Sequence, residues 1–139
     1  MKACPDTNVW LEWLRRPPAA LALDDRVRGQ VYVTTIALQE LWAGASAAAT
    51  PYLERLFSLA RIRGRVLNPP GAAWILSGQV LAVLARTHHL RSARLRALRN
   101  DVLLAATAMM HGATVLTYNT ADFALIGRVI PVRHRTPPH

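Results

Sequence analysis

Short apolar runs, separated by polar and helix-breaking residues, form the beginning of the chain. Residues 1–4 and 31–33 have the composition of β-strands, and the second run is β-branched and aromatic. Between them, a helix is expected to begin at Asp6 and to continue through Leu14, until the proline pair at 17–18 ends it. The pattern therefore predicts a strand, a helix and a second strand.

Apolar residues at helical spacing dominate the middle of the chain. Helices are expected over residues 36–46, 50–61 and 72–87, and the second of these has a proline in its first turn. A short strand is expected at 65–67, directly before an Asn-Pro-Pro-Gly break at 68–71.

The last third contains the most apolar helix. Segment 88–99 is rich in arginine and has few apolar side chains, so the helix is expected to begin at the Asn-Asp pair 100–101 and to occupy 102–110. A buried strand at 114–117 and a short edge strand at 129–132 follow.

This alternation of strands and helices predicts an α/β fold, in which helices cover both faces of a parallel sheet. The length of 139 residues suits one domain, 1–139, with a polar tail at 133–139. No apolar run approaches the roughly 18–20 residues that cross a bilayer, so we expect a soluble, cytoplasmic protein with no membrane contact.

The charge is strongly positive. Seventeen Lys and Arg residues oppose eight Asp and Glu residues, a formal net charge of +9, and Lys2 is the only lysine. Mutational bias in a GC-rich genome is one explanation for arginine in place of lysine, but it does not explain the shortage of acids. The excess charge favours a nucleic acid or another polyanion as partner.

The sequence lacks the motifs of several classes of enzyme and of binding site. The single cysteine, Cys4, excludes an internal disulfide and a thiolate zinc site. Phosphate-binding and dinucleotide-binding glycine motifs, Gly-x-Ser-x-Gly and His-Glu-x-x-His are all missing, which argues against a small-molecule α/β enzyme.

The eight acids separate into two groups by their neighbours. Four lie among polar or basic residues and are expected on the surface: Glu12, Asp24, Asp25 and Glu54. The other four lie at the ends of apolar strands or on apolar helices, where a carboxylate needs a partner or a function: Asp6, Glu40, Asp101 and Asp122.

Each acid of the second group also has a purely structural interpretation. Asp6 follows the first strand, at the edge where α/β sheets bind ligands, but it is also a good helix N-cap. Glu40 has small neighbours on its helix face, which predict a partly buried charge with room for a ligand, unless it extends to solvent. Asp101 either stabilises a helix N-terminus or points into a site. Asp122 follows a strand, yet it completes an apparent capping box.

Converging carboxylates repel one another unless a cation lies among them. Oxygen ligands suit Mg²⁺ or Mn²⁺ better than zinc. A hard cation beside arginines that bind phosphate is the set of groups needed to hydrolyse a phosphodiester.

Four segments, in order along nearly the whole chain, resemble the PIN domain, and in particular the small bacterial toxins of the VapC type. They are DTNV at 6–9, LQELWAG at 38–44, ND leading into LAATA at 100–108, and LTYNTADF at 116–123. The resemblance implies a three-layer α/β/α sandwich with a mostly parallel sheet of about five strands. It also implies a Mg²⁺- or Mn²⁺-dependent endoribonuclease that forms a homodimer and is blocked by a cognate antitoxin.

Carried over by position, the resemblance makes Asp6, Glu40 and Asp101 the core acids, with Asp122 or Asn119 completing the metal shell. The positions that support them are Thr7, Asn8 and Thr117. The arginines expected to contact the RNA backbone are Arg91, Arg94, Arg96 and Arg99, together with Arg15 and Arg16. The alternative function is a non-catalytic basic domain that binds nucleic acid in a salt-sensitive way, in which the acids are only helix caps.

Overall fold

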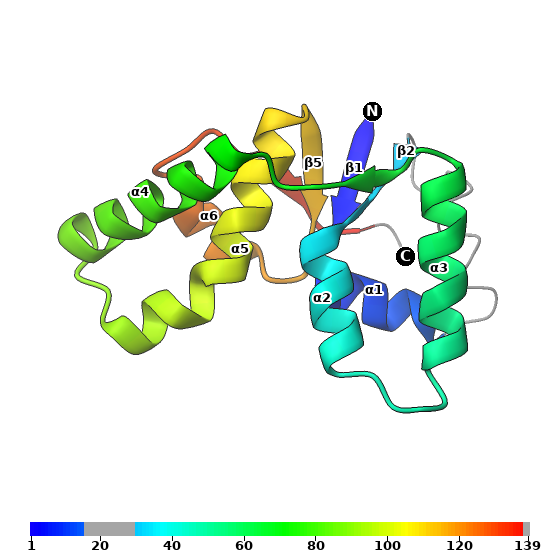
Figure 1. Cartoon of the computed structure of the whole chain (residues 1–139). Coiled ribbons are helices and arrows are strands. Elements are labelled where there is room, and N and C mark those ends of the chain that lie inside the picture. Colours follow the sequence, from blue (N-terminus) through cyan, green and yellow to red (C-terminus); the bar gives the residue numbers. More distant parts are fainter. Residues whose placement is uncertain (16–29, 138–139) are drawn as a thin grey trace.

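A four-stranded parallel sheet forms the centre of the protein (Figure 1). The computed structural model describes residues 1–15 and 30–137. The strand order is β2-β1-β5-β6, with β1 at Lys2–Pro5, β2 at Gln30–Val31, β5 at Ala113–Leu116 and β6 at His134–Arg135. All three pairings are parallel. The central strands β1 and β5 are buried almost throughout, which is why both appear in the sequence as nearly continuous apolar runs.

The strand expected at 31–33 is divided between two sheets. The Tyr32 N–H donates to the Ala3 carbonyl of the main sheet, whereas the next N–H, that of Val33, donates to the Arg65 carbonyl. Strand β3 (Val33–Thr34) therefore pairs in parallel with β4 (Val66–Leu67) in a separate two-stranded sheet.

Helices cover both faces of the sheet (Figure 1). The helices α1 (Thr7–Leu14), α2 (Thr35–Ala43) and α3 (Thr50–Ile62) contribute Trp10, Leu41 and Leu56 to one apolar core. The helices α4 (Gly71–Thr87), α5 (Ser92–Met110) and α6 (Thr120–Ile126) contribute Leu84, Leu98 and Phe123 to another. The predicted α/β architecture is confirmed. Within the described ranges, no helix is both long and apolar enough to cross a membrane.

The start of α5 differs from the prediction. The helix begins at Ser92, so the arginine-rich segment forms its first turns. Arginine and leucine are good helix formers, and Leu98 is fully buried in the core that α5 shares with α4. Asp101 therefore lies in the middle of a helix, and its interpretation as a charge at a helix N-terminus is wrong.

The last strand also differs. No strand forms at 129–132, because the N–H groups of Val129 and Ile130 donate to the Ile126 carbonyl and extend the end of α6 as a turn. Strand β6 forms later, within the segment expected to be a polar tail. The N–H groups of Val115 and Thr117 donate to the carbonyls of Arg133 and Arg135, at 2.9 and 3.0 Å.

Candidate active site

Asp6 lies at the carboxyl end of β1 and is both a helix cap and a buried part of the site. One carboxylate oxygen accepts from the Val9 N–H at 3.1 Å, which caps α1. The other accepts from the Thr117 hydroxyl at 2.5 Å. Thr117 follows β5, the parallel neighbour of β1, so the sheet itself brings these two residues together. The two interpretations of Asp6 are therefore compatible.

Glu40 reaches the same region from α2. Its carboxylate accepts from the Thr7 hydroxyl at 2.7 Å, across the contact between α1 and α2. The expectation that Glu40 is partly buried is wrong, because the side chain is exposed, as are Ala43 and Gly44 of its helix. Exposure leaves its second oxygen accessible to a ligand.

Asp101 has the most perturbed carboxyl group of the cluster. Burial, followed by the charges of Asp6, Asp122 and Glu40, raises the pKa of Asp101 to about 7, and Arg94 acts weakly in the opposite direction. Burial also raises the pKa of Asp6, although its hydrogen bonds from Thr117 and α1 oppose that rise. These carboxylates are close enough to repel one another in a partly desolvated site.

A cleft of about 110 Å³ connects three of the four acids. Its polar lining comes from Asp6, Thr7, Asn8, Glu40 and Asp101, and its apolar wall from Ile36, Ala37 and Leu104. Two predicted supporting residues, Thr7 and Asn8, therefore lie with the acids. Asp122 and Asn119 are not among the residues that line this cleft.

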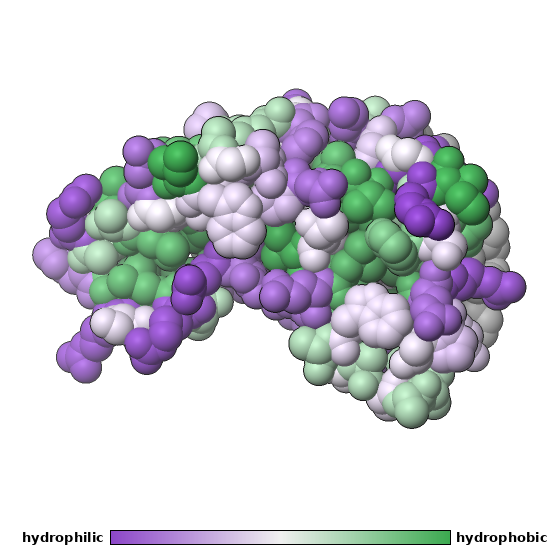
Figure 2. Space-filling model, viewed as in Figure 1, coloured by the Kyte–Doolittle hydropathy of each residue, from purple (hydrophilic) through white to green (hydrophobic). Residues whose placement is uncertain are grey.

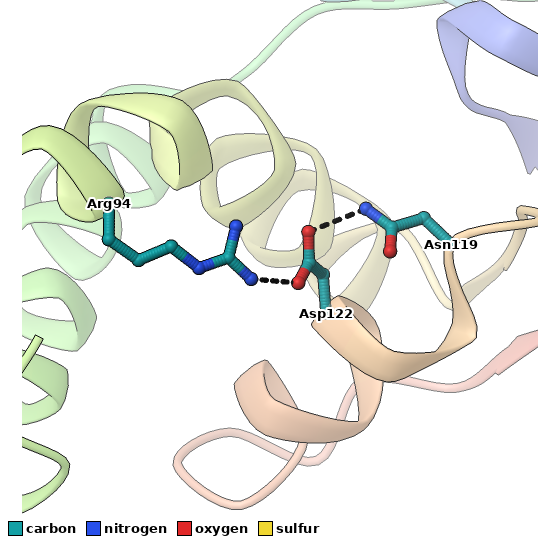
Figure 3. A network of polar contacts seen from close by, with 3 residues as sticks. All are labelled: Arg94, Asn119 and Asp122. Atoms are coloured by element: carbon teal, nitrogen blue, oxygen red, sulfur yellow. Dashed lines mark hydrogen bonds and ion pairs between the residues drawn. The ribbon is translucent and has the colours of Figure 1, made fainter.

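Asp122 is held in a separate network (Figure 3). One of its oxygens accepts from the Arg94 guanidinium, and the other accepts from the Asn119 amide at 2.6 Å. The capping-box interpretation is wrong, because the Asn119 N–H donates to the Thr117 hydroxyl at 2.9 Å rather than to Asp122. Sequence reasoning missed the Arg94–Asp122 pair, whose members are 28 positions apart.

The predicted RNA-binding arginines are distributed unevenly. Arg96 and Arg99 are exposed on the first half of α5, and Arg91 is exposed at the N-cap position directly before it. Hydrophilic side chains line the hollow between this part of α5 and α2 (Figure 2). Arg15 instead lines a mainly apolar cavity of about 270 Å³ between α1, α2 and α3, which none of the four acids lines, and Arg16 lies outside the described residues.

The donor set of the cleft suits a hard divalent cation. Three carboxylates and two neighbouring hydroxyl or amide side chains offer oxygen ligands, and burial, followed by the charges of the neighbouring acids, raises the pKa of Asp101 to about 7. Within the described part of the chain, no three acid, histidine or cysteine side chains are already gathered around one metal-sized position. The residues fit Mg²⁺ or Mn²⁺ by their chemistry and by the cleft they share.

The cleft lies beside Asp6 at the carboxyl end of a central strand, which is where α/β sheets bind their ligands. The chain belongs to the PIN domain family, whose members are generally nucleases, and the match to the family covers residues 3–129. The predicted family is thus confirmed.

The chain is similar to a plasmid stability protein and to chains of the FitAB and VapBC structures. It is 34% identical over 128 residues to the plasmid stability protein StbB of Pseudomonas syringae pv. tomato, covering 88% of this chain and 91% of that protein. A chain of FitAB bound to the IR36 DNA fragment superposes with a TM-score of 0.66 at 25% identity, covering 99% of this chain and 96% of that one. A chain of DNA-bound VapBC from Salmonella typhimurium gives 0.66 at 24% identity, covering 98% of each, which shows a shared fold.

Proposed function

We propose that this protein is a Mg²⁺- or Mn²⁺-dependent endoribonuclease and the toxin of a toxin–antitoxin pair. The observation that carries the proposal is the cleft lined jointly by Asp6, Glu40 and Asp101, in which burial and then repulsion from the neighbouring acids raise the pKa of Asp101 to about 7. A cluster of acids that resists its own ionisation is suited to hold a divalent cation.

Asp6, Glu40 and Asp101 would hold the metal, and the resemblance offers Asp122 or Asn119 as a fourth ligand. A bound cation supplies an activated water and offsets the negative charge that develops in phosphodiester hydrolysis. Thr117 and Thr7 orient the carboxylates of Asp6 and Glu40 through their hydroxyl hydrogen bonds.

RNA is the substrate that the charge of the protein favours. The net charge of +9 attracts a polyanion, and the exposed arginines of α5 adjoin the cleft wall to which Asp101 and Leu104 belong. The similar structures come from FitAB and VapBC, which supports an antitoxin as protein partner. A homodimer remains our expectation from the family.

The test is cleavage of total bacterial RNA by the purified protein, freed of any partner, with Mg²⁺, Mn²⁺ or a chelator. We expect discrete metal-dependent cuts, and a loss of rate of at least about 100-fold in Asp101→Asn and Asp6→Asn. Glu54→Gln is the matched control, because Glu54 is an exposed acid of α3 and is not among the residues that line the cleft.

Cleavage by Asp101→Asn at the wild-type rate would contradict the site assignment. Salt-sensitive RNA binding with neither cuts nor metal binding would favour the second candidate, a non-catalytic basic domain, for which the net charge of +9 is the supporting observation.

A further inference from the structure

Among the contacts of the described residues, Asp122 is the acid of the four whose carboxylate pairs with an arginine, and it does not line the cleft. Both of its carboxylate oxygens already accept hydrogen bonds, one from the Arg94 guanidinium and one from the Asn119 amide (Figure 3). Its side chain is 16% exposed, so water is a minor partner. The Arg94 guanidinium already offsets the charge of the Asp122 carboxylate, which weakens the attraction of that carboxylate for a metal cation, whereas the hydrogen-bond donors described for Asp6 are uncharged.

Arg94 is placed to contact a ligand of the cleft. It lies seven positions before Asp101 on α5, about two helical turns, so both residues are on the same helix face. The positive charge of Arg94 acts to lower the pKa of Asp101, although Arg94 is not among the residues that line the cleft. Its side chain remains 43% exposed while it is bound to Asp122, so part of the guanidinium is accessible.

We propose that Arg94, held in place by Asp122 and Asn119, binds a backbone phosphate of the RNA strand that enters the cleft, and that Asp122 positions this arginine instead of coordinating the metal. This inference rests on the proposed function. It assigns the fourth acid a different task from the three acids of the cleft.

The contacts favour a phosphate-binding arginine over one that blocks the site. A guanidinium in the metal position would contact the acids that line the cleft, whereas the contact described for Arg94 is with Asp122. An arginine fixed by a carboxylate loses less side-chain entropy when it binds phosphate, and its planar fork has N–H groups for both partners. The pair is therefore a preorganised phosphate site at the edge of the cleft.

The experiment compares Arg94→Gln, Asp122→Asn, the double variant, Arg94→Lys and Asp101→Asn with the wild type. Arg55→Gln is the control for loss of one positive charge, because Arg55 is exposed on α3. Three quantities are measured: Mn²⁺ affinity by calorimetry, affinity for a mixed-sequence single-stranded RNA 20-mer in EDTA across a salt series, and kcat and KM for metal-dependent cleavage. Circular dichroism verifies the folding of each variant.

We expect Arg94→Gln and Asp122→Asn each to weaken RNA binding by about 5- to 20-fold and to reduce the salt slope by about 0.7, as for one lost phosphate contact. The double variant should bind no more weakly than the single variants, because both remove the same contact. Arg94→Lys should restore the salt slope. Mn²⁺ affinity should stay within about twofold of wild type in these variants and fall at least about tenfold in Asp101→Asn.

Two outcomes would overturn the inference while leaving the nuclease intact. If Asp122→Asn loses Mn²⁺ affinity as Asp101→Asn does, Asp122 is a metal ligand. If Arg94→Gln cleaves faster or binds RNA as tightly as Arg55→Gln, Arg94 is a blocking or surface residue. Failure of the wild type to bind Mn²⁺ and to cleave RNA would instead contradict the proposed function, and the inference with it.

Discussion

At the scale of single residues, the site depends on how each carboxylate is partnered. Both carboxylate oxygens of Asp6 accept hydrogen bonds, and the carboxylate of Glu40 accepts one from the Thr7 hydroxyl. Burial and the acidic neighbours raise the pKa of Asp101. Asp101 is therefore the acid of the cleft that we expect to change its protonation near neutral pH in the metal-free protein.

A pH dependence of stability follows from Asp101. Because its pKa is about 7 in the folded protein and near 4 in an unfolded chain, the folded state binds this proton more tightly. The free energy of unfolding of the metal-free protein should therefore fall as the pH rises from about 4 to about 7, by about 1–3 kcal/mol after solvent screening is allowed for. Urea unfolding in EDTA at a series of pH values measures it.

Asp101→Asn is the control for that measurement. The variant has no proton to lose at this position, so its stability should depend less on pH and exceed that of the wild type at pH 8. Parallel pH curves for the two proteins would show that Asp101 is not the group responsible.

At the scale of helices and strands, the central strands and most helices could be predicted from local pattern. The expected helix at 72–87 corresponds to α4 at Gly71–Thr87, and the expected strand at 114–117 corresponds to β5. Errors occurred where tertiary contacts override composition. Burial of Leu98 stabilises the polar first turns of α5 as a helix. Hydrogen bonds with β5 hold His134–Arg135 as a strand.

Strand β6 should stabilise both the sheet and the site. A chain that ends after Val132 loses the acceptors of the Val115 and Thr117 N–H groups, and Thr117 holds Asp6. We expect a loss of about 1–3 kcal/mol in the free energy of unfolding, measured with urea, and weaker Mn²⁺ binding. A chain that ends after Pro137 keeps β6 and should match the full chain; equal stability of all three chains would argue against a role for β6.

At the scale of the whole molecule, negative charge is concentrated in one cleft, whereas the rest of the protein has an excess of arginines. A cation bound as proposed would offset the acid–acid repulsion in the cleft and would bind the folded state alone. Saturating Mn²⁺, at about 100 times its dissociation constant, should add about 2.7 kcal/mol of stability. For a chain of this length the midpoint of thermal unfolding should rise by about 5–10 °C.

Differential scanning calorimetry at constant ionic strength measures this shift. Asp101→Asn should show a much smaller rise, whereas Glu54→Gln should behave as wild type. An equal rise in Asp101→Asn would place the stabilising metal elsewhere.

Local patterns along the chain were sufficient to predict the α/β class, and four motifs were sufficient to predict the PIN domain family. They also singled out Asp6, Glu40 and Asp101, which the structure brings to one cleft, because strand ends and apolar helix faces restrict where a carboxylate is tolerated. Tertiary structure alone decided which acids share the cleft and which is bound by an arginine. The decisive contacts, Thr7–Glu40, Arg94–Asp122 and Thr117–Asp6, join residues 33, 28 and 111 positions apart. Side-chain periodicity describes neighbours on one element, whereas these distances depend on how separate elements pack.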